Sequence, residues 1–113
     1  MEKINSYRNA IHGLLTEHHD FLAVHTRTDV ETEIVSDDVN GQYMVMRVGW
    51  RGETRVRRPL FYLRLKDGNV HIEEDWTKDG IFHELVEAGV APWDIVLAFQ
   101  PPTLREAHKL TPA

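Results

Sequence analysis

The sequence predicts an α+β protein: a long N-terminal helix and a shorter second helix packed on an antiparallel β-meander sheet of four to five strands. Three observations predict this class. Apolar residues recur every three or four positions over residues 2–24, period-two alternation follows in four later segments, and turn-forming pairs separate those segments. With 113 residues and no cysteine, we expect one domain, residues 1–113, whose core needs no disulfides.

The first helix is predicted from its apolar stripe. The residues that share one face are Ile4, Tyr7, Ile11, Leu14, Leu15, His18 and Leu22. A stripe of this width faces a core. Gly13 weakens the helix by about 1 kcal/mol relative to alanine.

Four strands are expected at residues 30–34, 43–50, 54–66 and 70–75. The turns between them are expected at residues 37–41, at Arg51-Gly52 and at Asp67-Gly68, which are residue pairs suited to hairpins. Pro59 interrupts the third strand and removes a ladder donor, so we expect a bulge or a sheet edge there.

A second helix is expected at residues 78–88, with Thr77 as its N-cap and Gly89 as the left-handed residue after its end. Val90 should then pack back on Leu85. The apolar run at residues 95–99 has the length of a strand and could add a fifth one to the sheet. Pro101-Pro102 ends that run, and residues 103–113 form a polar C-terminal tail.

The chain carries a net charge of -5, but the charge is unevenly distributed. Residues 47–66 hold seven Lys and Arg residues against Glu53, a net +6, so the rest of the chain carries -11. A candidate nucleic-acid patch consists of Arg47, Arg51, Arg55, Arg57 and Arg58. The favoured alternative pairs this basic hairpin across strands with acidic neighbours, namely Glu31, Glu33, Glu73 and Glu74.

No catalytic arrangement stands out. His71, Glu73 and Asp75 alternate along one predicted strand and should share one sheet face. They could form a metal or acid–base cluster, although the polar, solvent-facing side of a strand is the favoured interpretation. Zinc-type histidine spacings and phosphate-binding glycine loops do not occur, and Ser6 and Ser36 lie outside any nucleophile motif. We therefore expect no enzyme activity, no cofactor and no metal site.

The sequence resembles the XisI family, the fdxN-element excision controlling factors of cyanobacteria. The residues that carry the resemblance are Val48-Gly49-Trp50, Arg55-Val56, Asp75-Trp76-Thr77, Gly80-Ile81, Glu84-Leu85-Val86, Gly89-Val90, residues 94–99 and Pro101-Pro102. The resemblance is strongest from Val48 to Arg105, and it departs from the family pattern at Ala91, Gln100 and in the tail.

The resemblance implies a non-enzymatic regulatory protein. The cytoplasm is the expected location because residues 1–5 lack the pattern of a secretory signal and no apolar run has the length of a membrane helix. The family is associated with excision of the fdxN element, a DNA rearrangement of heterocyst differentiation, in which a separate site-specific recombinase exchanges the strands. XisI-like proteins act there as controlling factors beside a companion protein, XisH. The family supplies no catalytic residues to carry over.

The leading hypothesis is therefore a controlling factor that binds an XisH-like protein. The candidate partner interface consists of Trp50, Trp76, Pro101, Pro102 and Arg105. A homo-oligomer through a sheet edge is an alternative. Direct nucleic-acid binding by the basic hairpin is the second hypothesis, and a metal-dependent enzyme is the third. No apolar run approaches the length of a membrane helix.

Overall fold

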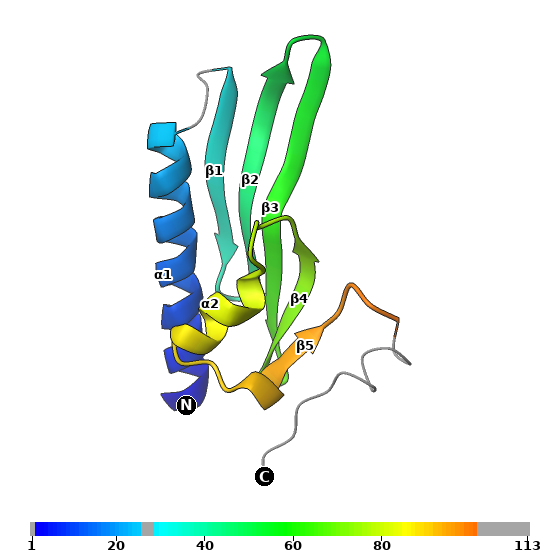
Figure 1. The fold of residues 1–113 in the computed structure, drawn as a ribbon. Helices are drawn as coiled ribbons and strands as arrows, with labels where there is room; N and C mark the ends of the chain where they lie inside the picture. The colour runs from blue at the N-terminus through cyan, green and yellow to red at the C-terminus, as the bar shows by residue number, and fades with distance from the viewer. Residues whose placement is uncertain (1, 26–28, 102–113) are drawn as a thin grey trace.

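The computed structural model describes residues 2–25 and 29–101, and it places two helices against one face of a five-stranded sheet (Figure 1). In chain order the elements are α1 (Glu2–His25), β1 (Val30–Asp37), β2 (Gln42–Arg51), β3 (Thr54–Lys66), β4 (Asn69–Asp75), α2 (Ile81–Glu87), the 3₁₀ turn η1 (Pro92–Asp94) and β5 (Ile95–Leu97). The predicted α+β class is confirmed, as are the first helix and the four meander strands, with small differences at their ends. The predicted tail 103–113 lies outside the described residues.

The sheet has the order β1-β2-β3-β4-β5 and is mixed. The first four strands pair antiparallel with their neighbours, whereas β5 pairs parallel with β4, with Val70 opposite Ile95. The fifth strand is parallel because the chain crosses back through α2 before it re-enters the sheet, as parallel neighbours require. The apolar run therefore does join the sheet, but not as another meander strand.

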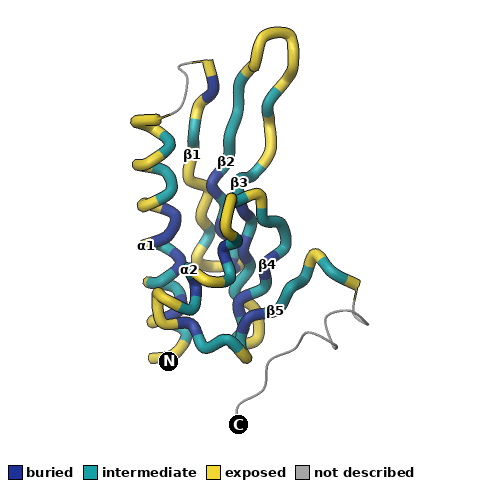
Figure 2. Tube along the Cα trace, in the orientation of Figure 1, coloured by how far each residue is buried: buried dark blue, intermediate teal, exposed yellow. Residues whose placement is uncertain are grey.

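The core lies between the helices and one half of the sheet. Its fully buried members come from α1, α2, the three strands β2, β3 and β4, and the segment after α2: Ile11, Leu15, Tyr43, Val45, Phe61, Leu63, Val70, Ile72, Ile81, Leu85 and Val90. Figure 2 shows the buried residues gathered beside α2, whereas the far end of the β2–β3 hairpin is mostly exposed. No helix in the described ranges is long and apolar enough to cross a membrane.

A β-bulge interrupts the regular pairing of the long strand β3 on each of its two sides. Val45 lies opposite Phe61 but Met46 lies opposite Pro59, so Leu60 is an extra residue and the bulge predicted at Pro59 is confirmed. On the other side, Leu63 lies opposite Ile72 but Tyr62 lies opposite Glu74, so Glu73 is an extra residue in β4.

The second bulge corrects the predicted cluster of His71, Glu73 and Asp75. The extra residue reverses the alternation, so Asp75 lies opposite the buried Phe61 and turns toward the helices instead of sharing a face with His71. Within residues 2–25 and 29–101, no three His, Cys, Asp or Glu side chains come close enough to hold a metal ion.

Asp75 instead organises the start of α2. Its Oδ2 accepts the backbone N–H of Ile81 at 2.8 Å, and its Oδ1 accepts the backbone N–H and the hydroxyl of Thr77 at 2.9 and 2.5 Å. The prediction that Thr77 caps the helix is therefore wrong: α2 begins at Ile81, after Gly80, and the carboxylate that serves it comes from the end of β4.

The end of α2 follows the prediction. The backbone N–H of Val90 donates to the carbonyl of Leu85 at 2.9 Å, and that of Gly89 donates to Val86 at 3.0 Å. Gly89 has φ +106, and Val90 and Leu85 are both buried. This is the hydrogen-bond pattern of a Schellman motif, with its apolar contact.

A polar contact ties the N-terminal part of α1 to η1, directly before β5. The Tyr7 hydroxyl donates to Asp94 Oδ2 at 2.6 Å and accepts the Ala91 N–H at 3.2 Å, while Lys3 Nζ lies 2.9 Å from the same carboxylate. Burial opposes ionisation of Asp94, but the hydrogen bonds from Tyr7 and Lys3 outweigh it and lower the pKa of the carboxyl group.

Replacing this carboxylate should cost stability in a pH-dependent way. Because the folded pKa lies below the unfolded value, the stabilisation is complete above the unfolded pKa and is lost as the pH falls through the folded pKa. We expect Asp94→Asn to lower the free energy of unfolding by about 1–3 kcal/mol at neutral pH, and by less in acid. Urea unfolding at several pH values measures both effects.

The matched control is Asp79→Asn, which removes an exposed carboxylate beside α2. It should change the stability by a few tenths of a kcal/mol at most. An Asp94→Asn deficit that stays constant as the pH falls would contradict the assignment.

Candidate functional site

The structure brings the five arginines of the predicted nucleic-acid patch together. Arg47 of β2 lies directly opposite Arg58 of β3 and, on its other side, opposite Thr32 of β1. All five arginines line one pocket of about 460 Å³ at the free end of the β2–β3 hairpin, together with Thr54 and Val56: they are Arg47, Arg51, Arg55, Arg57 and Arg58. We call this the arginine pocket.

The expected pairing of these arginines with glutamates is wrong. Alternation places Glu31 and Glu33, opposite Val48 and Met46, on the sheet face away from Arg47 and Arg58. Arg55 and Arg57 share the face of these carboxylates but form no ion pair with them. None of the five arginines forms an ion pair with a carboxylate in the described part of the chain. Of the basic segment, Arg64 does so, with Glu73 at 3.7 Å.

The charges in the arginine pocket have no carboxylate partner among the described residues, and the charge of Arg47 is partly desolvated, whereas the other four arginines are exposed. Burial lowers the pKa of Arg47, and the neighbouring charges of Arg51 and Arg58 lower it further. The Nε atom of Arg47 and the Oγ1 atom of Thr32 are both buried without a hydrogen-bond partner. Guanidinium groups so arranged are suited to a carboxylate or a phosphate, which they bind with paired, charge-assisted hydrogen bonds.

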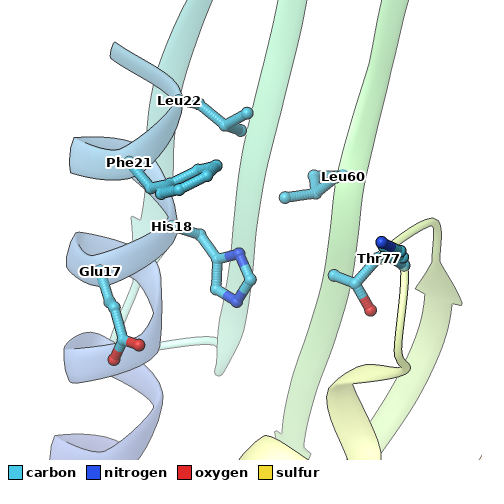
Figure 3. Close-up of a pocket in the computed structure, with 7 residues that line it drawn as sticks. Glu17, His18, Phe21, Leu22, Leu60 and Thr77 are labelled. Atoms are coloured by element: carbon cyan, nitrogen blue, oxygen red, sulfur yellow. The ribbon is translucent and has the colours of Figure 1, made fainter. Parts of the chain in front are cut away.

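A second pocket, of about 390 Å³, lies between the C-terminal half of α1 and β3 (Figure 3). Its lining residues are Glu17, His18, Phe21, Leu22, Leu60, Thr77 and Lys78. We call it the apolar pocket, because Phe21, Leu22 and Leu60 dominate its wall. Figure 3 shows Phe21 and Leu22 pointing across toward Leu60. Sequence reasoning missed this pocket, and the only signal was Phe21, an aromatic residue beside the core stripe.

His18 forms the lower wall of the apolar pocket and is held in place on two sides. Its Nε2 atom lies 2.7 Å from Glu84 Oε1 of α2, and its ring meets the edge of Phe61 with 5.2 Å between centroids. Phe21 has no comparable anchor in the core and is 60% exposed. The pocket therefore has a fixed base and an exposed apolar rim.

Trp76 contacts one lining residue of each pocket. The Arg58 guanidinium lies over the Trp76 ring, 4.3 Å from its centroid, and the Trp76 backbone N–H donates to the Leu60 carbonyl at 2.7 Å. Arg58 lines the arginine pocket, whereas Leu60 and Thr77 line the apolar one. A ligand that spans both pockets would meet cationic and apolar surface in succession.

Of the predicted partner-interface residues, the structure places Trp50 and Trp76 on different faces of the sheet. Trp50 lies at the end of β2 with Arg55 stacked 5.1 Å from its ring centroid, on the sheet face opposite Arg47 and Arg58. Trp76 accompanies Arg58 on the helix side and is 54% exposed. Pro101 is exposed after β5, and Pro102 and Arg105 lie outside the described residues. The interface as a set stays a prediction.

The residues that carry the family resemblance have structural roles. A Cβ atom at Gly49 would stand 2.1 Å from the Asp29 carbonyl oxygen, which also accepts the Trp50 N–H at 3.1 Å, so only glycine permits β1 to begin there. Asp75 caps α2, Gly89 ends it, and Asp94 holds α1. The motif residues thus determine the fold, while the arginine pocket draws only part of its lining from them.

The fold and the site define a small α+β protein with an uncompensated cationic pocket and an adjoining apolar one. The XisI protein family matches residues 1–111, and the chain belongs to this family. Two solved structures are similar. A XisI-like protein from Anabaena variabilis is 31% identical with a TM-score of 0.84, covering 92% of this chain and 94% of that one. The fdxN element excision controlling factor XisI from Anabaena variabilis is 32% identical with a TM-score of 0.77, covering 91% and 98%. No match was found among curated protein sequences.

The uncompensated charge of Arg47 should make the free protein less stable than an apolar variant. Arg47→Met keeps much of the aliphatic stem and removes the repulsion from Arg51 and Arg58. We expect the free energy of unfolding to rise by about 1 kcal/mol, as at sites where function opposes stability. Urea unfolding at low and high salt measures the effect, which salt should reduce by screening.

Arg64→Met is the control, because that arginine has a carboxylate partner in Glu73. It should not stabilise the protein. If Arg47→Met destabilises the chain as much as Arg64→Met does, the charges of the arginine pocket are compensated after all.

Proposed function

We propose that this protein is a non-enzymatic controlling factor of the XisI type, which regulates by binding a protein partner. The observation that supports it most is membership of the XisI family over nearly the whole chain, with 32% identity to a protein described as the fdxN element excision controlling factor XisI. The two adjoining pockets add a surface that has no occupant within the described chain. The proposed partner is an XisH-like companion, and the proposed process is control of a DNA rearrangement.

Co-expression tests the proposal. The chain and the XisH-like protein of the same host should co-elute from size-exclusion chromatography at a fixed stoichiometry, which light scattering measures. The chain alone serves as the control and also reports any homo-oligomer. Separate elution of the two proteins across the accessible concentration range would contradict the proposed partner.

Direct binding to nucleic acid is the second candidate function. The observation that favours it is the clustering of five arginines on a hairpin that continues past the first pair of β1 and β2, Val30 with Gly49 (Figure 1). A two-stranded ribbon of this kind has dimensions that fit the major groove of DNA. The net charge of -5 weighs against it.

Salt dependence tests the second candidate. If the arginines contact phosphates, the logarithm of the affinity for duplex DNA should fall linearly with the logarithm of the salt concentration, with a slope of about -0.9 per phosphate contacted. The triple variant Arg55→Ala, Arg57→Ala and Arg58→Ala should abolish binding, whereas Arg64→Ala should reduce it little. A mobility-shift assay without any complex at low salt would rule this candidate out.

A further inference from the structure

We propose that the arginine pocket and the apolar pocket together bind one acidic segment of a protein partner, which places carboxylates among the arginines and an apolar side chain beside Leu60. This inference rests on the proposed function, because it specifies how the partner is held. It goes further in assigning the site and the chemistry of the segment that fills it.

The arginine pocket is suited to an anionic ligand. Like charges directly opposite each other on paired strands are unfavourable, yet Arg47 and Arg58 occupy such positions with no carboxylate in the described chain to offset them. Arg47 Nε and Thr32 Oγ1, on directly opposite residues, are also buried without a hydrogen-bond partner. A carboxylate would compensate the charge and supply the missing acceptor.

The apolar pocket is suited to an apolar side chain rather than to a phosphate backbone. Phe21 is 60% exposed at the rim, and Leu60 and Leu22 form the wall behind it. An apolar recess beside charged residues is the arrangement in which a buried anchor residue contributes most of the affinity of a protein interface. Arg58 and Leu60 are two residues apart in β3, so the anchor should lie about two residues from a carboxylate.

The edge of β3 is open along the same stretch. β4 pairs with β3 only from Phe61 to Lys66, so residues 54–59 of β3 have a strand neighbour on the β2 side alone. Backbone groups on that open side can pair with an added extended segment. An acidic segment laid along residues 54–59 would place alternate side chains toward the arginines, which accounts for the charged edge and the adjoining pocket together.

Two other occupants fit the charges less well. A second copy that paired edge to edge would bring two sets of arginines together, which charged edges normally prevent. The chain's own residues 102–113 contain Arg105 and Lys109 against Glu106 alone, so their charge does not complement an arginine pocket.

Selection of short random peptides displayed on phage, with the full-length chain immobilised, tests the proposal without assuming any partner. Enriched peptides should carry Asp or Glu with a Leu, Ile or Phe about two residues away. A labelled enriched peptide is then titrated by fluorescence anisotropy. Arg47→Gln with Arg58→Gln, and separately Leu60→Gln, should each weaken its binding at least about tenfold. The control Arg64→Gln removes a charge from the same strand outside both pockets and should leave the affinity unchanged.

Circular dichroism confirms the fold of each variant, and Leu60→Ala replaces Leu60→Gln if the latter fails to fold. Enrichment of peptides without acidic residues, or equal binding by all variants, overturns the inference. Duplex or single-stranded DNA that binds with the same arginine dependence while no acidic peptide is enriched also overturns it, in favour of a phosphate ligand. If acidic peptides bind as expected but the XisH-like protein does not co-elute, the proposed partner fails and the site assignment survives.

Discussion

The rest of the structure depends on one face of the sheet, which changes from apolar to positively charged at the bulge that Leu60 makes in β3. On one side of this bulge Val45 and Phe61 face each other in a fully buried core, and on the other side Arg47 and Arg58 face each other with no compensating charge. The helices cover the first part, where apolar burial stabilises the fold. The second part consequently carries positive charges that have no carboxylate partner in the described chain.

The sequence features that identify the family and those that form the site are largely separate. Gly49 permits the close approach of β1, Asp75 caps α2, and Asp94 joins α1 to the last strand. Gly49 and Asp75 satisfy backbone requirements that few alternatives meet, and Asp94 binds the side chains of Tyr7 and Lys3. The proposed binding, in contrast, uses charges and an exposed phenylalanine ring that no single motif defines.

Periodicity was sufficient to predict α1, the four meander strands, and the clustering of arginines on their hairpin, because alternation and turn residues leave a local signal. It was insufficient where one extra residue changes a register. The bulge at Glu73 turned Asp75 toward the helices, and this displaced both the predicted cluster and the predicted cap at Thr77. The arginine–glutamate pairing failed for a similar reason, because strand register is a property of two segments, and one segment does not reveal it. The parallel direction of β5 likewise required knowing where α2 returns the chain.

The most direct test of this account is amide hydrogen exchange along β2 and β3, in the free protein and in its complex with a bound partner. The account predicts that the amides of Val45, Phe61 and Leu63 are strongly protected in both states, whereas those of residues 48–58 exchange quickly in the free protein and become protected on binding. Uniform protection of the hairpin in the free protein would contradict the division of the sheet into a stable core and an open binding end. Protection on binding that appears only outside residues 48–60, α1 and residues 76–78 would contradict the assignment of the site.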